Sequence, residues 1–238
     1  ISILMKTQCI LFLVFLLSIS SSRAQDVPIH FKHFTTNQGL SQNNVTSVLQ
    51  DSRGFMWFGT QDGLNKFDGY EFEIYRNNPN RARSLRDSYI WKVFEDREGR
   101  IWLGTDNGGL NLFDRTTDRF TYYINKPGDP KSLSHNKVVA IAQDRDGKIW
   151  VGTQGGGLDL FDPATGTFSH FVHNAANPRS LSHNSVSDIQ VDKKGRVWVA
   201  TYGGGLNLLD KSRKGFIHYK HTPSDPVSLS LNDLTDLH

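Results

Sequence analysis

The feature that most constrains the fold of this chain is a segment that recurs four times. In its third copy, residues 144–162, the segment reads Asp-Arg-Asp-Gly-Lys-Ile-Trp-Val-Gly-Thr-Gln-Gly-Gly-Gly-Leu-Asp-Leu-Phe-Asp. The other copies occupy 51–68, 96–114 and 192–210. Each copy contains one tryptophan, and Trp57, Trp102, Trp150 and Trp198 are separated by 45, 48 and 48 residues. Self-similarity at this spacing indicates a repeat architecture in which each repeat is one supersecondary unit.

Each repeat contains four short runs of β-type composition separated by turn residues. In the third copy these runs are 137–143, 148–153, 158–162 and 167–173. The corresponding runs are 45–50, 55–60, 64–68 and 70–76 in the first copy, 89–95, 100–105, 110–114 and 119–124 in the second, and 186–191, 196–201, 206–210 and 215–221 in the fourth. No window beyond residue 24 shows a helical period of 3.6 residues. The chain is therefore predicted to be all-β.

The turns between the first and second runs share the pattern Asp-x-x-Gly. Such an aspartate can accept backbone N–H bonds, and the glycine permits a positive φ. The residues are Asp51 and Gly54, Asp96 and Gly99, Asp144 and Gly147, and Asp192 and Gly195. Because each repeat carries one such aspartate at the same turn, a structural role is favoured over metal binding or acid–base catalysis.

Four antiparallel strands repeated at this period predict the blades of a β-propeller. The blades are expected at about 45–76, 89–124, 137–173 and 186–221; a β-solenoid is the alternative, but its coils are much shorter. The segment 31–34 resembles an isolated fourth strand, and 231–237 resembles the start of a further first strand. We therefore expect a partial propeller over 25–238, truncated at residue 238, with four complete blades and one orphan strand at each end.

Residues 1–24 have the features of a secretory signal peptide, with Met5 as the expected start. An apolar run spans 10–17, and the small residues Ser22 and Ala24 stand at the positions that determine cleavage, which is expected after Ala24. A transmembrane anchor is the alternative, but the run is shorter than the roughly 20 residues that span a bilayer. The chain is thus predicted to be exported.

Removal of this segment changes the charge and the cysteine content. Loss of Lys6 and Arg23 leaves 25 basic and 24 acidic side chains, a formal charge of +1. A nearly neutral exported chain has no electrostatic basis for binding nucleic acid. Cys9 is the only cysteine and leaves with the signal peptide, so no disulfide contributes to stability.

The repeated pattern Asp-x-x-Gly-x-(Ile/Met/Val)-Trp-x-Gly-Thr-x-x-Gly-Gly-Leu-x-x-(Phe/Leu)-Asp resembles the two-component-regulator propeller repeat. The opening Phe-x-His-Phe-x-x-x-x-Gly-Leu-Ser-x-Asn-x-Val, residues 31–45, looks like the start of the periplasmic sensor region of hybrid two-component histidine kinases. The resemblance covers roughly 29–237. The fourth copy departs from the pattern with Ala200 for glycine and Leu209 for phenylalanine, which leaves the blade prediction intact.

This resemblance implies a non-enzymatic sensor domain on the periplasmic face of the inner membrane of a Gram-negative bacterium, often one for oligosaccharides. The partners it implies are an oligosaccharide or other small ligand, the missing C-terminal part of the same polypeptide with its membrane anchor and kinase core, and a second protomer in a homodimeric receptor. No catalytic group, metal site or cofactor is predicted in this chain. An exported propeller enzyme, such as a lyase or glycoside hydrolase, and a secreted interaction scaffold remain alternative functions.

A candidate binding face follows from the alternation of strand direction. The loops between second and third strands and those between fourth and next first strands emerge at the same end of each blade. Trp91 stands where the other copies have Thr46, Val139 and Ser187, so it breaks the repeat. Sites commonly lie on loops displayed by a rigid scaffold. The predicted ligand-binding residues on this face are Trp91, Asn107, Gln154 and Tyr202, whereas the repeated Ser-Leu-Ser-His-Asn loops are predicted to join neighbouring blades.

Overall fold

The computed structural model describes residues 31–238; the predicted signal peptide and Cys9 lie outside the described residues. The chain divides into two units, Ile1–His33 and Phe34–His238, and the fold below is that of the second. This unit contains one short 3-10 helix, η1 (Thr36–Gln38), and sixteen β-strands. Among residues 31–238 there is no helix with the length and hydrophobicity to cross a bilayer.

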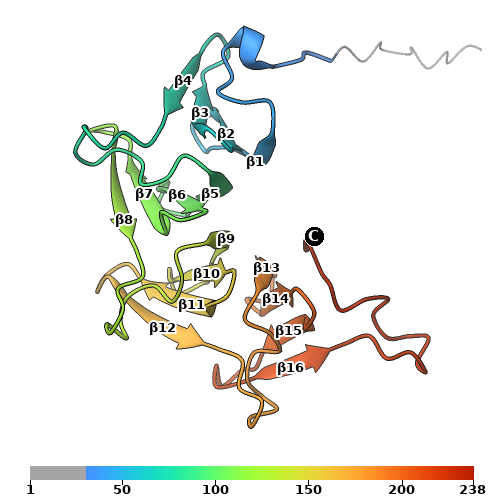
Figure 1. Cartoon of the computed structure of the whole chain (residues 1–238). Coiled ribbons are helices and arrows are strands. Elements are labelled where there is room, and N and C mark those ends of the chain that lie inside the picture. Colours follow the sequence, from blue (N-terminus) through green and yellow to red (C-terminus); the bar gives the residue numbers. More distant parts are fainter. Residues whose placement is uncertain (1–30) are drawn as a thin grey trace, which may run out of the picture. The chain divides into compact units, whose positions relative to one another are not determined.

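The strands form four antiparallel sheets of four, and in each sheet neighbouring strands are consecutive in the chain (Figure 1). The first sheet contains β1 (Val45–Gln50), β2 (Met56–Thr60), β3 (Gly63–Phe67) and β4 (Phe72–Tyr75), and the second contains β5 (Ile90–Glu95), β6 (Ile101–Thr105), β7 (Leu110–Asp114) and β8 (Arg119–Tyr123). The third contains β9 (Val138–Gln143), β10 (Ile149–Thr153), β11 (Gly157–Asp162) and β12 (Thr167–Phe171), and the fourth contains β13 (Val186–Val191), β14 (Val197–Thr201), β15 (Gly205–Leu209) and β16 (Phe216–Tyr219). The prediction of an all-β chain with four four-stranded blades is confirmed.

The first strand of every blade has an irregular register near its start. Ile90 pairs with Thr105 and Lys92 pairs with Gly104, so Trp91 is left out of the pairing. The same shift leaves out Thr46, Val139 and Ser187 in the other blades. A bulge of this kind bends a strand and redirects the side chain of the extra residue. The bulge therefore turns the side chain of Trp91 out of the sheet, at the same position where Trp91 breaks the sequence repeat.

Successive blades pack through their first two strands. β1 contacts β5, β5 contacts β9, and β9 contacts β13, while the second strand of each of the first three blades also contacts the following first strand. The contact is close enough to require glycine in the second strand: a Cβ on Gly104 would come within 2.6 Å of the carbonyl oxygen of Val138. The glycine of the repeat is thus explained by the approach of the next blade.

The tryptophans of the repeat fill the spaces between blades. Trp57 and Trp102 are fully buried, and their rings lie 5.4 Å from Phe113 and 5.7 Å from Phe161 of the following blade. Each of the three apolar clusters contains residues of two successive blades. Burial of large aromatic groups between repeats is the main favourable term for such an architecture.

The two terminal segments pack on the blades without forming ladders. Leu40 is buried, and the Ser41 N–H donates to Asn65 Oδ1 at 2.8 Å. At the other end the Leu237 N–H donates to Asp188 Oδ2 at 3.1 Å. The C-terminal segment also bonds through its backbone, since the Leu234 N–H donates to the Thr201 carbonyl at 3.3 Å. The segments expected to be orphan strands near 31–34 and 231–237 nevertheless contain no assigned strand.

Candidate ligand-binding face

The repeated aspartates serve the turns and the tryptophans. Asp51 Oδ1 accepts the N–H groups of Arg53 and Phe55, both at 2.9 Å, and Oδ2 accepts the indole N–H of Trp57 at 2.8 Å. Burial acts to raise the pKa of Asp51, but the bonds from Trp57 and Arg115 outweigh it and the pKa lies below its ordinary value. A carboxylate with these bonds is a structural group that stays ionised.

The same indole bond forms in the second and fourth blades but not in the third. Trp102 donates to Asp96 at 2.7 Å and Trp198 to Asp192 at 3.2 Å. Trp150 Nε1 is buried without a partner, and Arg213 donates to Asp144 Oδ2 at 3.0 Å. Sequence analysis missed the aspartate–tryptophan bond, although the constant six-residue spacing between the two side chains was a visible signal.

The loops that connect blades repeat one arrangement. Each of the three loops carries a buried leucine, and so does the segment before the first blade: Leu85, Leu133, Leu181 and Leu40 are at most 4% exposed. The next backbone N–H in each loop donates to a buried side chain of the third strand, as Ser182 does to Asn207 Oδ1 at 2.9 Å. A carbonyl further along accepts from the glycine of the preceding hairpin, as Asn136 does from Gly109 at 3.0 Å. These contacts join adjacent blades and support a structural role for the repeated loop residues.

Trp91 lies at the centre of a cluster that does not repeat. Its indole N–H donates to Asp106 Oδ1 at 2.9 Å, and its ring stacks on Tyr89 with centroids 4.7 Å apart and planes inclined by 21°. Lys137 Nζ lies 4.7 Å from the centroid of the Trp91 ring and 3.0 Å from Asp106 Oδ1. A lysine over an indole face gains a cation–π attraction in addition to the ion pair.

Side chains at the edge of this cluster complete it. Gln61 donates to the Tyr89 hydroxyl at 3.1 Å, and Asn107 donates to Asp106 Oδ2 at 3.0 Å. We call the six residues Gln61, Tyr89, Trp91, Asp106, Asn107 and Lys137 the aromatic cluster. They come from three successive blades and lie at the loop-rich end of the inner strands. Burial acts to raise the pKa of Asp106, but the bonds from Trp91 and Lys137 dominate and lower it.

The four predicted ligand-binding residues are only partly brought together. Trp91 and Asn107 both contact Asp106. The Gln154 N–H donates to the Lys137 carbonyl at 3.0 Å, which places Gln154 beside the cluster, whereas Tyr202 bonds through its backbone to Ser185 in the fourth blade and is 38% exposed. Sequence reasoning missed Tyr89, Asp106 and Lys137 because their proximity depends on how three blades pack. The one available signal was that Asp106 replaces Gln61, Gln154 and Tyr202 of the other copies.

Comparison with known proteins shows that the repeats are similar to those of a described family. A family model described as "Two component regulator propeller" matches residues 39–62, 84–107, 132–155 and 180–203. A histidine kinase from Formosa agariphila is 52% identical over 65 residues, which are 27% of this chain and 5% of that protein. The matched segment is thus a small part of the kinase.

Solved structures share the fold over most of the chain. The extracellular domain of a hybrid two-component system from B. thetaiotaomicron superposes with a TM-score of 0.73 at 32% identity, covering 82% of this chain and 27% of that one. A second such domain from the same organism gives a TM-score of 0.62 at 26% identity, covering 77% and 26%. Virginiamycin B lyase from Staphylococcus aureus, at 12% identity and a TM-score of 0.56 over 76% of this chain and 56% of its own, shares the fold alone. The chain spans about a quarter of the length of the two extracellular domains.

Proposed function

Because this chain is built from two-component-regulator propeller repeats, we propose that it is the ligand-sensing part of a hybrid two-component sensor histidine kinase. The support is its similarity to extracellular domains of hybrid two-component systems and to a stretch of a histidine kinase. Such a domain acts on the periplasmic side of the inner membrane, and the kinase core belongs to the remainder of the polypeptide. The propeller itself carries out no reaction in this proposal; it converts ligand binding into a change of kinase activity.

The observation that carries the choice of ligand is the aromatic cluster. Trp91 and Tyr89 form a stacked pair of rings, and Asp106, Lys137 and Asn107 place acceptors and donors beside them. The apolar C–H face of a sugar packs on an aromatic ring, while its hydroxyls bond to carboxylate, amide and ammonium groups. We therefore propose an oligosaccharide as the ligand, bound on the loop-rich face at the aromatic cluster around Trp91.

Binding at this place can be coupled to signalling because the cluster spans three blades. A ligand that contacts Gln61, Trp91 and Lys137 at once would favour one relative position of those blades and of the segment that follows them. A ligand shifts an equilibrium only by its different affinity for the two states. We propose that the states are two arrangements of the protomers in a homodimeric receptor, of which the liganded one changes kinase activity.

Calorimetric titration of the ectodomain of the full-length protein with a panel of oligosaccharides tests the proposal. We expect one class of oligosaccharide to bind and Trp91→Ala to weaken it by about tenfold or more, because buried aromatic contacts dominate such interfaces. Val139→Ala alters the equivalent bulge of the third blade and should leave affinity unchanged. Binding by none of the panel, or equal affinity in both variants, would contradict glycan sensing on this face. Formation of a cleaved product during titration would favour the enzyme alternative.

A further inference from the structure

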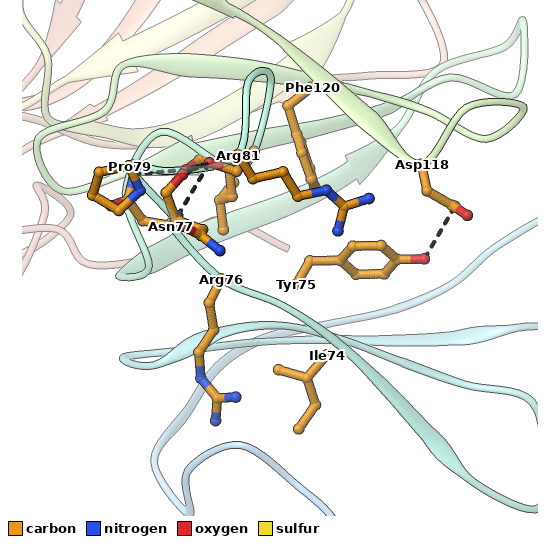
Figure 2. A pocket seen from close by; sticks show the side chains of 11 residues that line it. Ile74, Tyr75, Arg76, Asn77, Pro79, Arg81, Asp118 and Phe120 are labelled. Carbon is orange, nitrogen blue, oxygen red and sulfur yellow. Dashed lines mark hydrogen bonds between the residues drawn. The ribbon is translucent and has the colours of Figure 1, made fainter.

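A pocket of about 380 Å³ lies at the outer ends of the first two blades (Figure 2). Tyr75, Leu85 and Phe120 line it and are almost completely buried, whereas Arg81 and Asp118 line it and are exposed. None of the residues that line this pocket belongs to the aromatic cluster. A volume of this size lies near the lower end of the range for small-molecule sites.

Arg81 brings to the pocket a guanidinium group that makes no hydrogen bond within the described chain. The other arginine of the lining, Arg76, is paired with Asp62 at 3.0 Å. No side chain or carbonyl among residues 31–238 is recorded as accepting a hydrogen bond from the Arg81 guanidinium, which Figure 2 shows extended over Tyr75 toward Asp118. A guanidinium presents a planar set of donors that matches carboxylate and sulfate oxygens.

The loop that carries Arg81 departs from the other inter-blade loops. At the corresponding position the other two inter-blade loops have Asp129 and Asn177, and the segment after the fourth blade has Asp225. Each of these side chains accepts the backbone N–H two residues later at 2.9–3.0 Å. Arginine cannot accept this bond, and Arg83, two residues later, adopts a φ of 59°. Among the inter-blade loops of the described chain, the first alone lacks this turn bond and contains a non-glycine residue in the left-handed region. Departures of this kind cluster at functional sites.

The remaining polar groups of the pocket can bind a neutral part of the same ligand. The Tyr75 hydroxyl donates to Asp118 Oδ1 at 3.2 Å. Burial, together with the nearby carboxylates of Glu73 and Asp118, raises the pKa of Tyr75, so the phenol remains a neutral donor. Asp118 Oδ2 has no recorded partner in the described chain and can accept from a hydroxyl group.

From these observations we propose that the pocket binds a small molecule that carries a carboxylate or sulfate group. Arg81 donates to the oxyanion, Asp118 accepts from a hydroxyl, and the Tyr75 and Phe120 rings form an apolar floor. This second site is independent of the aromatic cluster and of the function proposed above.

Titration calorimetry of the whole chain at fixed ionic strength tests the proposal with D-glucuronate, D-glucose and inorganic sulfate. We expect glucuronate to bind and glucose to bind at least about tenfold more weakly, since a bond to a charged group is worth that much. If sulfate binds as tightly as glucuronate, an oxyanion alone is sufficient for binding to the pocket. If sulfate binds more weakly, the preferred ligand is an acidic sugar. Binding of neither anion, or equal binding of glucose and glucuronate, overturns the proposal.

Two variants of Arg81 and one control variant test whether binding takes place in this pocket. Arg81→Asn introduces the residue that the loop between the third and fourth blades has at this position, Asn177. The variant should therefore fold with an unchanged melting temperature and lose glucuronate affinity by about tenfold or more. Arg81→Lys keeps the charge without the planar donor set, and its glucuronate affinity should lie between those of the unchanged chain and Arg81→Asn. Arg53→Asn removes an exposed arginine from the opposite end of the first blade and serves as the control. Glucuronate affinity that is unchanged in Arg81→Asn, or lowered equally in Arg53→Asn, overturns the assignment.

Discussion

A single residue distinguishes the third blade from the other three in the centre of its sheet. Asn65, Asn111 and Asn207 occupy one buried position, and Asp159 occupies it in the third blade. The asparagines donate to backbone carbonyls, which an ionised aspartate cannot do. Asp159 Oδ1 instead pairs with His170 Nδ1 at 2.7 Å, and His170 Nε2 lies 2.9 Å from the Pro130 carbonyl. Both ring nitrogens face acceptors, so the charged imidazolium fits this place.

The pH dependence of stability should reflect this pair. The bond to Asp159 raises the pKa of His170, with burial opposing it. The stabilisation is therefore complete below the unfolded pKa of about 6.5 and is lost as pH rises through the higher folded value. Thermal melts between pH 6 and pH 9 should show a falling midpoint. Asp159→Asn, the residue of the other blades, should flatten that fall; an unchanged slope would show that another group is responsible.

The indole N–H bond offers a second test at this scale. Trp102→Phe removes a donor to the buried Asp96, whereas Trp150→Phe removes a donor that has no partner. Both changes shrink a fully buried ring by a similar amount. Denaturant unfolding should therefore show a larger loss for Trp102→Phe, by about 1.5–3 kcal/mol, the usual worth of a bond to a charged group. Equal losses would mean that the bond adds no net stability.

Among the elements, the second strand decides how closely two blades approach. A Cβ on Gly152 in β10 would lie 2.5 Å from Val186 Cγ1 and 3.0 Å from Ala140 Cβ, both atoms of first strands. The backbone of Gly152 has an ordinary φ, so the requirement is steric and comes from the next blade. In β14 the same position holds Ala200, which is fully buried.

Gly152→Ala should accordingly destabilise the chain by about 1–3 kcal/mol, the usual cost of overpacking. Chemical denaturation measures the change. Ala200→Gly, the reverse exchange at the equivalent position, should cost about 0.5–1 kcal/mol through backbone entropy. If space were available between the third and fourth blades, Gly152→Ala would stabilise the strand instead, and that result would exclude the steric explanation.

For the whole molecule, the protection of backbone amide hydrogens from exchange with solvent is expected to differ between blades. Trp102, Trp150, Leu110 and Leu158 are fully buried, but the equivalent Trp198 and Leu206 of the fourth blade are only half-buried. Local opening is easiest where fewer apolar contacts must be broken. Hydrogen exchange followed by mass spectrometry should therefore show faster exchange in β15 and β16 than in β7 and β8. Uniform protection across the four blades would indicate that they open as one cooperative unit.

Much of this fold could be predicted from sequence because its determinants are local. Asp96, Gly99 and Trp102 lie within seven residues, and their spacing alone specifies a turn and an inward-facing ring. The candidate site could be predicted only in part. Trp91 was visible as a break in the repeat, but Gln61 and Lys137 reach its neighbourhood from blades on either side, and no pattern within one repeat reports such a contact.

The sequence by itself determined the number of blades, the strands within each and the turns that join them, because alternation, turn chemistry and period are properties of neighbouring residues. Only the tertiary structure decided which side chains meet. The aromatic cluster and the Arg81 pocket depend on the bulge of β5, on the path of one inter-blade loop and on the distance between blades, all of which are set by packing between residues far apart in the chain.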